Sequence, residues 1–244
     1  MQKYFVSDED FLANQITGED CHHIKNVMRC KPGDEIIVSN ETNEVLAKIT
    51  SIEVNIVRYE VKMAIQNNSE LPFFIDLYQG YPKGDKLEDI IKHSTELGVS
   101  SIYAVIMKRS LFKLDSKKKE SKLERFQKIA KEASEQSHRR CLARVKDIIE
   151  LRKIDFSKYD KLIICYEEDA KVGEASNFKQ IIKSLKPNDK VAVLVGPEGG
   201  IDDSEIDYLK SLGFVSCGLG PRILRTETAS MYVLSSISYE WELK

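Results

Sequence analysis

At 244 residues the chain is long enough to bury a substantial core, in one large domain or two smaller ones. Its five cysteines are odd in number and form no CxxC pair, which argues against a disulfide framework and favours a reducing compartment. No signal peptide opens the sequence, and no apolar run approaches the ~20 residues that span a bilayer, so we expect a soluble, cytoplasmic protein without a membrane partner. The formal net charge of −2 argues at first sight against a nucleic-acid partner.

The first 70 residues predict a small antiparallel β-barrel. A short helix over 19–29 precedes a Lys-Pro-Gly-Asp turn at 31–34. Segments 35–40, 44–53 and 55–66 are then rich in Val and Ile with partial period-two alternation, which is typical of strands. A polar stretch over 67–72 predicts a linker, so we divide the chain into a domain over 1–70 and a second over 73–244.

From residue 73 onward, strands and helices alternate. The predicted strands cover 73–80, 99–107, 161–168, 191–196 and 215–220. Between them lie predicted helices at 86–97, 177–185 and 202–212, a long basic helix after residue 110, and a last helix ending near Trp241. This rhythm predicts an α/β fold with a largely parallel sheet and helices on both faces. Physical reasoning alone predicts an unknotted chain, because true knots are very rare.

Positive charge is concentrated between residues 108 and 146. This segment holds 14 Lys and Arg against five Asp and Glu, a net charge of +9, so the rest of the chain carries −11. Such segregation is typical of a protein that binds a polyanion. The alternative is the solvated face of an amphipathic helix, because five apolar residues recur at helical spacing: Leu123, Phe126, Ile129, Ala130 and Ala133. The adjoining His-Arg-Arg at 138–140 favours RNA.

A conformationally special loop follows the apolar run 191–195. Residues 196–200 read Gly-Pro-Glu-Gly-Gly, so the backbone is free to adopt unusual φ values and no Cβ obstructs a ligand, while Pro197 fixes one φ. Loops at strand ends of α/β proteins commonly hold nucleotides or anions. The spacing matches neither GxGxxG nor GxxxxGK[ST], and tight turns without a ligand are the alternative.

A second motif, LGPRILRTETA at 219–229, places two arginines around an apolar pair, followed by Thr226 or Thr228 as the cap of a helix. Together with the loop at 196–200, this motif resembles the RsmE family, the small-subunit ribosomal RNA uracil-N3 methyltransferases of the SPOUT class. The resemblance extends to segments 22–36, 83–102, 108–110 and 135–140 and covers nearly the whole chain. His93 and Ala143 depart from the family's usual residues.

The resemblance implies a fold and a cofactor. The second domain is expected to be a SPOUT methyltransferase domain with a deep trefoil knot, and the first a PUA-like RNA-binding barrel. S-adenosylmethionine is the expected cofactor. Its implied binding residues are Tyr166, Glu167, Gly196, Pro197, Glu198, Gly199, Gly200, Leu219, Gly220, Ile223, Leu224, Arg225 and Thr226. The apolar pair at 223–224 is equally compatible with ordinary core packing.

The implied reaction is methylation of uracil N3 in small-subunit (16S) ribosomal RNA. The imide proton must leave, so Glu198 and Glu227 are candidate bases, and Arg225 is a candidate for stabilising negative charge on the uracil oxygens. Glu227 and the two arginines of the second motif each have an alternative role. Glu227 would also stabilise a helix N-terminus through the macrodipole, and Arg222 and Arg225 would also serve as partners of carboxylates.

Ribosomal RNA and a second copy of the chain are the expected partners. The residues expected to contact RNA are His22, Arg29, Lys83, Arg109, Arg139, Arg140 and Arg222. For His22 and His23, an ordinary amphipathic helix face is the alternative. The family places its site at a subunit interface, which implies a homodimer through the apolar-rich last helix. No metal is expected, because only four histidines occur, none with zinc-like partner spacing.

Two other functions compete with this hypothesis. One is a SPOUT enzyme with another target, such as ribose 2′-O-methylation of transfer RNA. The other is a non-catalytic RNA-binding module, such as an assembly factor. Segments 22–29 and 222–229 favour the base methyltransferase.

Overall fold

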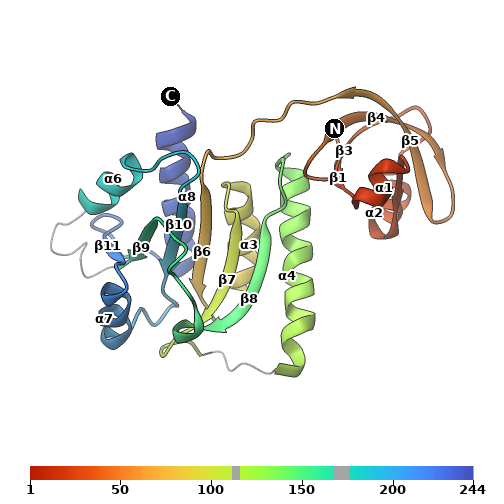
Figure 1. Ribbon diagram of the computed structural model, residues 1–244. Coiled ribbons are helices and arrows are strands. Elements are labelled where there is room, and N and C mark those ends of the chain that lie inside the picture. Colours follow the sequence, from red (N-terminus) through yellow and green to blue (C-terminus); the bar gives the residue numbers. More distant parts are fainter. Residues whose placement is uncertain (112–115, 167–175, 244) are drawn as a thin grey trace. The chain divides into compact units, whose positions relative to one another are not determined.

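The computed structural model describes residues 1–111, 116–166 and 176–243, and the chain forms two compact units (Figure 1). Unit 1 comprises Met1–Glu70 with Ser134–Leu142, and unit 2 comprises Leu71–Ala133 with Ala143–Lys244. The sequence-based division at residues 70–73 thus assigns 134–142 to the second domain, whereas this segment packs with unit 1. Among the described helices, none is both long and apolar enough to cross a membrane.

Unit 1 is built on a five-stranded sheet in the order β1-β3-β4-β5-β2. The three long strands, β3 (Glu35–Ser39), β4 (Glu44–Ile52) and β5 (Ile56–Ala64), confirm the predicted segments and pair antiparallel. The edge strands β1 (Lys3–Phe5) and β2 (Gln15–Thr17) are too short to show alternation in the sequence, and β1 pairs parallel to β3. Two register shifts between β4 and β5 increase the local twist and curl the sheet.

Three helical segments accompany this sheet: α1 (Asp8–Leu12), α2 (Gly18–His22) and a π-helical turn, η1 (His23–Val27). The predicted helix over 19–29 is therefore an α-helix continued by a π-turn. The turn at 31–34 forms as predicted, with the Asp34 amide donating to the Lys31 carbonyl at 3.0 Å and Gly33 at a φ of 105°. The unit's core is formed by Tyr4, Ile16, Cys21, Ile24, Ile36, Val38, Val45, Ala47, Ile49, Val57 and Tyr59.

Unit 2 is built on a six-stranded sheet in the order β11-β9-β10-β6-β7-β8, in which all five pairings are parallel. The strands are β6 (Phe74–Gly80), β7 (Ser101–Ile106), β8 (Arg144–Glu150), β9 (Lys161–Cys165), β10 (Lys190–Val195) and β11 (Val215–Cys217). The predicted parallel sheet is confirmed. Edge strand β8 was not predicted, because four of its seven residues are charged on a strand that only one neighbour pairs.

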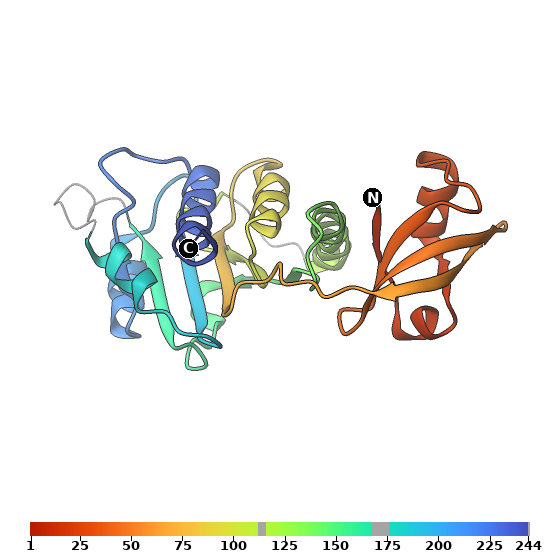
Figure 2. The ribbon, with the colours of Figure 1, turned by 90° about the horizontal axis from the view of Figure 1, so that it is seen from above.

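Helices cover both faces of this sheet (Figure 2). In central strand β10, Val191, Val193 and Val195 join one hydrophobic cluster with residues of α3 (Lys86–Glu96), α4 (Ser116–Gln136), α6 (Ser176–Lys183) and α8 (Thr226–Glu242). The alternating residues Ala192 and Leu194 join a second cluster with α7 (Asp203–Ser211) and the 3₁₀ turn η2 (Leu151–Lys153). A strand buried on both faces shows a continuous apolar run, as 191–195 does.

Candidate functional site

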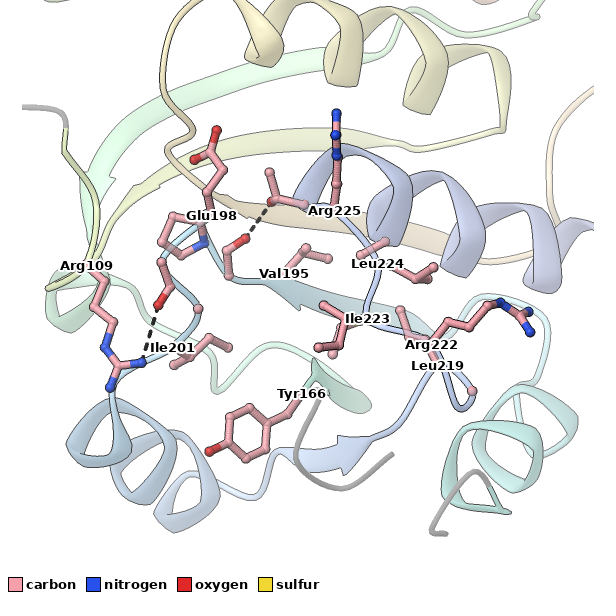
Figure 3. Close-up of a pocket in the computed structure, with 18 of the residues that line it drawn as sticks. Arg109, Tyr166, Val195, Glu198, Ile201, Leu219, Arg222, Ile223, Leu224 and Arg225 are labelled. Carbon is pink, nitrogen blue, oxygen red and sulfur yellow. Dashed lines mark hydrogen bonds between the residues drawn. The ribbon is translucent and has the colours of Figure 1, made fainter. Parts of the chain in front are cut away.

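A cleft of about 580 Å³ opens at the carboxyl ends of the parallel strands in unit 2 (Figure 3). It is lined by segment 195–201 after β10, the end of β9, the connection between β11 and α8, and Arg109 after β7. Ligand sites of open parallel sheets lie at this edge, and the volume is typical of a site for a small organic ligand. Of the predicted cofactor residues, the cleft is lined by Tyr166, Gly196, Pro197, Glu198, Gly199, Gly200, Leu219, Gly220, Ile223, Leu224, Arg225 and Thr226. Glu167 lies outside the described residues.

Close backbone packing explains two glycines at the base of the cleft. A Cβ at Gly80, the last residue of β6, would lie 2.5 Å from the Pro197 nitrogen, and one at Gly196 would lie 2.7 Å from Cγ1 of Ile201. Gly200 has a φ of 72°, and its amide donates to the Pro197 carbonyl at 2.9 Å. The loop at 196–200 therefore needs glycine for its own packing and conformation. Gly80 was not singled out in the sequence, although it ends a predicted strand.

Buried hydrogen bonds fix this loop to helix α8. The Thr226 hydroxyl donates to the Gly196 carbonyl at 2.6 Å and accepts from the Gln79 amide at 2.7 Å. The Ser230 hydroxyl in turn donates to the Gln79 side-chain oxygen at 2.5 Å. The predicted capping role of Thr226 or Thr228 is wrong, because Arg225 is the N-cap residue without a side-chain cap bond, and the Thr226 hydroxyl is used by the loop. Gln79 was not identified from the sequence. The signal that could have identified it is a polar amide side chain within a largely apolar strand.

The middle of the cleft is apolar. Figure 3 shows Val195, Ile201, Leu219, Ile223 and Leu224 grouped there. Leu219 and Leu224 pack against the main core cluster, whereas the Ile223 residue is 72% exposed. Of the predicted apolar pair, Leu224 thus contributes to the core as well as to the cleft wall. Ile223 is not a core residue, and it offers the cleft an apolar surface for a ligand.

Two carboxylates, Glu198 and Glu227, share one lysine. Glu198 lines the cleft, whereas Lys86 and the predicted site residue Glu227 are not among the lining residues. The Lys86 ammonium lies 3.1 Å from the Glu198 carboxylate and 3.4 Å from that of Glu227. The Lys83 backbone amide donates to both Glu198 oxygens at 3.1 Å. Partial burial acts to raise the pKa of Glu198, but the backbone amides and the Lys86 ammonium outweigh it, so the pKa lies below its ordinary value. Glu198 is therefore an ionised acceptor at neutral pH.

The two arginines of the second motif are exposed at the cleft. Figure 3 shows the Arg225 side chain pointing to the same side as Glu198, while Arg222 points elsewhere. Within residues 1–111, 116–166 and 176–243, neither guanidinium forms an ion pair with a carboxylate. The alternative role as partners of carboxylates is therefore not observed in this part of the chain. Both guanidinium groups face solvent at the rim and are placed to bind an anionic ligand.

Arg109 and Lys108 support the far side of the same loop. Arg109 donates to the Gly199 carbonyl at 3.3 Å, and its guanidinium lies 3.7 Å from the Asp202 carboxylate. Lys108 lies 3.1 Å from that carboxylate as well. Hydrogen bonds from the Ser204 hydroxyl and the Lys108 ammonium lower the pKa of Asp202 to about 2. Arg109, predicted to contact RNA, thus also lines the cleft and holds its loop.

The remaining basic residues predicted to contact RNA differ in exposure. Lys83 is exposed in unit 2, and His22, Arg29 and Arg140 are exposed in unit 1. Arg139 is only 4% exposed, and its guanidinium forms an ion pair with Glu70. Its burial leaves no surface for a phosphate, so the prediction for Arg139 is corrected to a structural role inside unit 1. In the described part of the chain, no group of three or more His, Cys, Asp or Glu is arranged to hold a metal ion.

Family models match both units. A model for an RNA methyltransferase domain matches residues 69–238, and one for an RNA methyltransferase PUA domain matches residues 16–57. The chain is 43% identical over 251 residues to ribosomal RNA small subunit methyltransferase E of Bacillus subtilis, covering 100% of this chain and 98% of that protein.

Solved structures share the fold over nearly the full length. A crystal structure described as a hypothetical protein has a TM-score of 0.90 and 40% identity, covering 99% of each chain. Ribosomal RNA small subunit methyltransferase E from Neisseria gonorrhoeae, bound to S-adenosyl methionine, has a TM-score of 0.83 and 27% identity, covering 99% of this chain and 98% of that one. These similarities extend over both units of the chain.

Proposed function

This chain belongs to the ribosomal RNA small subunit methyltransferase E family, and we propose that it methylates N3 of a specific uridine in small-subunit ribosomal RNA. It is an S-adenosylmethionine-dependent ribosomal RNA methyltransferase. The observation that carries the finer proposal is the cleft itself. Its apolar wall adjoins Glu198, which shares Lys86 with Glu227, and two exposed arginines without ion-pair partners in the described residues.

The cleft fits S-adenosylmethionine. Ile223, Leu219 and Val195 offer an apolar surface for the adenine ring, and the glycine loop offers backbone groups that no Cβ shields. When bound, this cofactor supplies an electrophilic methyl group on a sulfonium. The surrounding residues bind and orient the cofactor. The hydrogen bond from the Thr226 hydroxyl to the Gly196 carbonyl keeps the glycine loop in place and so preserves the shape of the wall.

Base methylation at N3 needs a group that accepts the imide proton and a group that stabilises charge on the uracil oxygens. Glu198 is ionised, but a lowered pKa makes it a weak base, so its stronger contribution is to accept a hydrogen bond from N3–H and orient the base. Glu227 is the second carboxylate of the same cluster. Arg225 is free to stabilise negative charge on a uracil oxygen.

Unit 1 supplies RNA contacts in this proposal. It carries the PUA match, and the exposed side chains of His22, Arg29 and Arg140 lie on it. Lys83, Arg109 and Arg222 supply contacts from unit 2. Backbone phosphates are bound mainly by such Lys and Arg side chains.

The knot, the homodimer and the cytoplasmic location belong to the same proposal. The trefoil knot is proposed because the chain belongs to this methyltransferase family. A homodimer is supported by exposed aromatic side chains on α8, with Tyr232 42% and Tyr239 69% exposed. The ribosomal RNA substrate favours the cytoplasm.

Nucleoside analysis tests the reaction. Small-subunit ribosomal RNA lacking its modifications is incubated with the full chain and S-adenosylmethionine carrying an isotope-labelled methyl group. Digestion and mass analysis should give labelled N3-methyluridine. Ribose-methylated nucleosides would support the 2′-O alternative, and absence of any labelled nucleoside would support the non-catalytic assembly factor.

Calorimetry tests the cofactor site. Ile223→Asp introduces a charge into the apolar wall at a residue that is 72% exposed, so we expect the fold to persist and S-adenosylmethionine affinity to fall at least tenfold. Val54→Asp is the matched control, because Val54 is 79% exposed and lies in unit 1. Equal cofactor affinity in both variants would contradict the assignment.

A further inference from the structure

Lys86 is the first residue of α3 and was not singled out from the sequence. Its ammonium contacts a carboxylate from the loop after β10, Glu198, and one from the first turn of α8, Glu227. The side chains of the three residues are 38%, 34% and 21% exposed, in the order Lys86, Glu198, Glu227. One cation thus joins three segments that are far apart in the sequence.

Two carboxylates held by one ammonium are close to each other. The distances of 3.1 and 3.4 Å place the two nearest carboxylate oxygens within about 6.5 Å. Like charges at such separations disfavour the simultaneous ionisation of both groups, and a cation within 4 Å of both reverses that preference. Removing Lys86 therefore changes the protonation of the pair as well as its position.

We infer that Lys86 is a positioning residue for methyl transfer, which favours the charged form of Glu198 and holds the Glu198 and Glu227 carboxylates in place so that the N3–H of uracil meets an acceptor. This inference rests on the proposed function. An ionised carboxylate only accepts hydrogen bonds, whereas a protonated one also donates. The imide N–H of uracil is a donor and requires an acceptor opposite it.

No other described charged side chain near Glu198 and Glu227 contacts both carboxylates. Lys83 and Asp85 precede α3, and the Lys83 contact to Glu198 comes from its backbone amide. On α3 itself, Glu88 pairs with Arg125 at 2.8 Å. Arg225, at the start of α8, makes no ion pair with either carboxylate in the described chain. Lys86 alone among the described side chains contacts both Glu198 and Glu227.

Direct titration tests the electrostatic half of the inference. Carboxyl carbons of Glu198 and Glu227 are followed by NMR across pH in the full chain without RNA, for the wild type, Lys86→Met, Lys86→Gln and Lys86→Arg. In both neutral variants we expect at least one of the two carboxyl titrations to move upward by roughly one pH unit, as expected on losing an opposite charge at this distance. Lys86→Arg should titrate like the wild type. Unchanged titration in both neutral variants would overturn the inference.

The pH dependence of methyl transfer tests the functional half. Single-turnover rates should show an acidic limb that moves upward in Lys86→Met and Lys86→Gln and is restored in Lys86→Arg, with S-adenosylmethionine affinity retained. Lys92→Met is the matched control, because Lys92 is exposed on the same helix and should leave the profile unchanged. An unmoved limb in both neutral variants would overturn the inference. A wild type that makes no N3-methyluridine would instead refute the proposed function, while the NMR titrations still decide whether Lys86 controls the carboxylates.

Discussion

Two short segments each carry two arginines, and they differ in whether an arginine is buried in an ion pair or exposed. In segment 138–141, Arg139 is buried against Glu70, and the same carboxylate accepts the backbone amides of Arg140 and Cys141 at 2.9 and 3.2 Å. In segment 222–226, Arg222 and Arg225 are exposed beside the cleft, without an ion pair in the described chain. Both segments contain arginines, but only the first has a carboxylate that accepts hydrogen bonds from one of them.

This difference separates cations that stabilise the fold from cations that remain available to a ligand. A buried guanidinium is stable only when its donors are satisfied, and Glu70 satisfies Arg139 within unit 1. An exposed guanidinium at a cleft retains its donors for a phosphate or a developing charge. Loss of the first type should therefore appear in stability, and loss of the second in turnover or binding.

The largest expected effect is on the stability of unit 1. Arg139→Met leaves the Glu70 carboxylate without its charged partner, so the free energy of unfolding should fall by about 3–5 kcal/mol, the cost typical of breaking a buried pair. Amide hydrogen exchange of β3 and β4 in the full chain measures the opening of this unit. Arg140→Met is the matched control and should leave exchange nearly unchanged. Equal exchange in the two variants would contradict the structural role of Arg139.

Acidification should weaken the same contact. Burial acts to raise the pKa of Glu70, but hydrogen bonds and charge from Arg139, with two backbone amides, outweigh it and lower that pKa below its ordinary value. A lowered folded-state pKa stabilises the fold above the unfolded pKa, so this stabilisation is lost as pH falls through the folded value. The protection factors of the β3 and β4 amides, which correct for the intrinsic pH dependence of exchange, should fall on acidification in the wild type, and Arg139→Met should remove part of that dependence.

Next in size is the effect of Arg225 on turnover. Arg225→Met should lower the single-turnover methylation rate by about 10²–10³-fold, as losing one charge-stabilising donor typically does, while calorimetry shows unchanged S-adenosylmethionine affinity. Arg222→Met is the comparison variant, for which we expect weaker RNA binding with the rate at saturating RNA retained. A wild-type rate in Arg225→Met would contradict a role in charge stabilisation.

A smaller effect is expected from removing the hydroxyl of Thr226, the residue that follows Arg225. Thr226→Val removes the hydroxyl that bonds the Gly196 carbonyl and the Gln79 amide, which should destabilise unit 2 by about 1–3 kcal/mol and weaken S-adenosylmethionine binding. Thermal unfolding and calorimetry measure the two effects. Thr226→Ser keeps the hydroxyl and should retain most of both properties. If Thr226→Ser loses as much as Thr226→Val, packing of the methyl group rather than hydrogen bonding holds the loop.

The smallest effect concerns Arg140 and the salt dependence of RNA binding. If Arg140 contacts one phosphate, Arg140→Ala should flatten the slope of log affinity against log salt by about 0.7 on single-stranded RNA. Arg125→Ala is the control, because Arg125 already pairs with Glu88. Slopes that match the wild type in both variants would identify the basic segment as a solvated helix face.

The basic segments also show which parts of the site could be predicted from the sequence. Segments 196–200 and 219–226 were predicted to share a site, and both line one cleft. The charge count over 108–146 predicted a surface for a polyanion. In the structure, however, at least five of its cations contact carboxylates: Lys108, Arg109, Lys119, Arg125 and Arg139. A charge count cannot register these contacts, because the acidic partners are far away in the sequence.

The sequence by itself determined the parallel sheet, the curled N-terminal sheet and the two motifs, since strand periodicity and glycine-proline chemistry are local properties of the chain. Tertiary structure alone decided the functions of Gln79, Lys86 and Arg139. Each of these side chains has a partner more than 60 residues away: Thr226 for Gln79, Glu198 for Lys86 and Glu70 for Arg139. Whether a polar side chain is buried, paired or available depends on which acceptor the fold brings to it, and no local pattern contains that information.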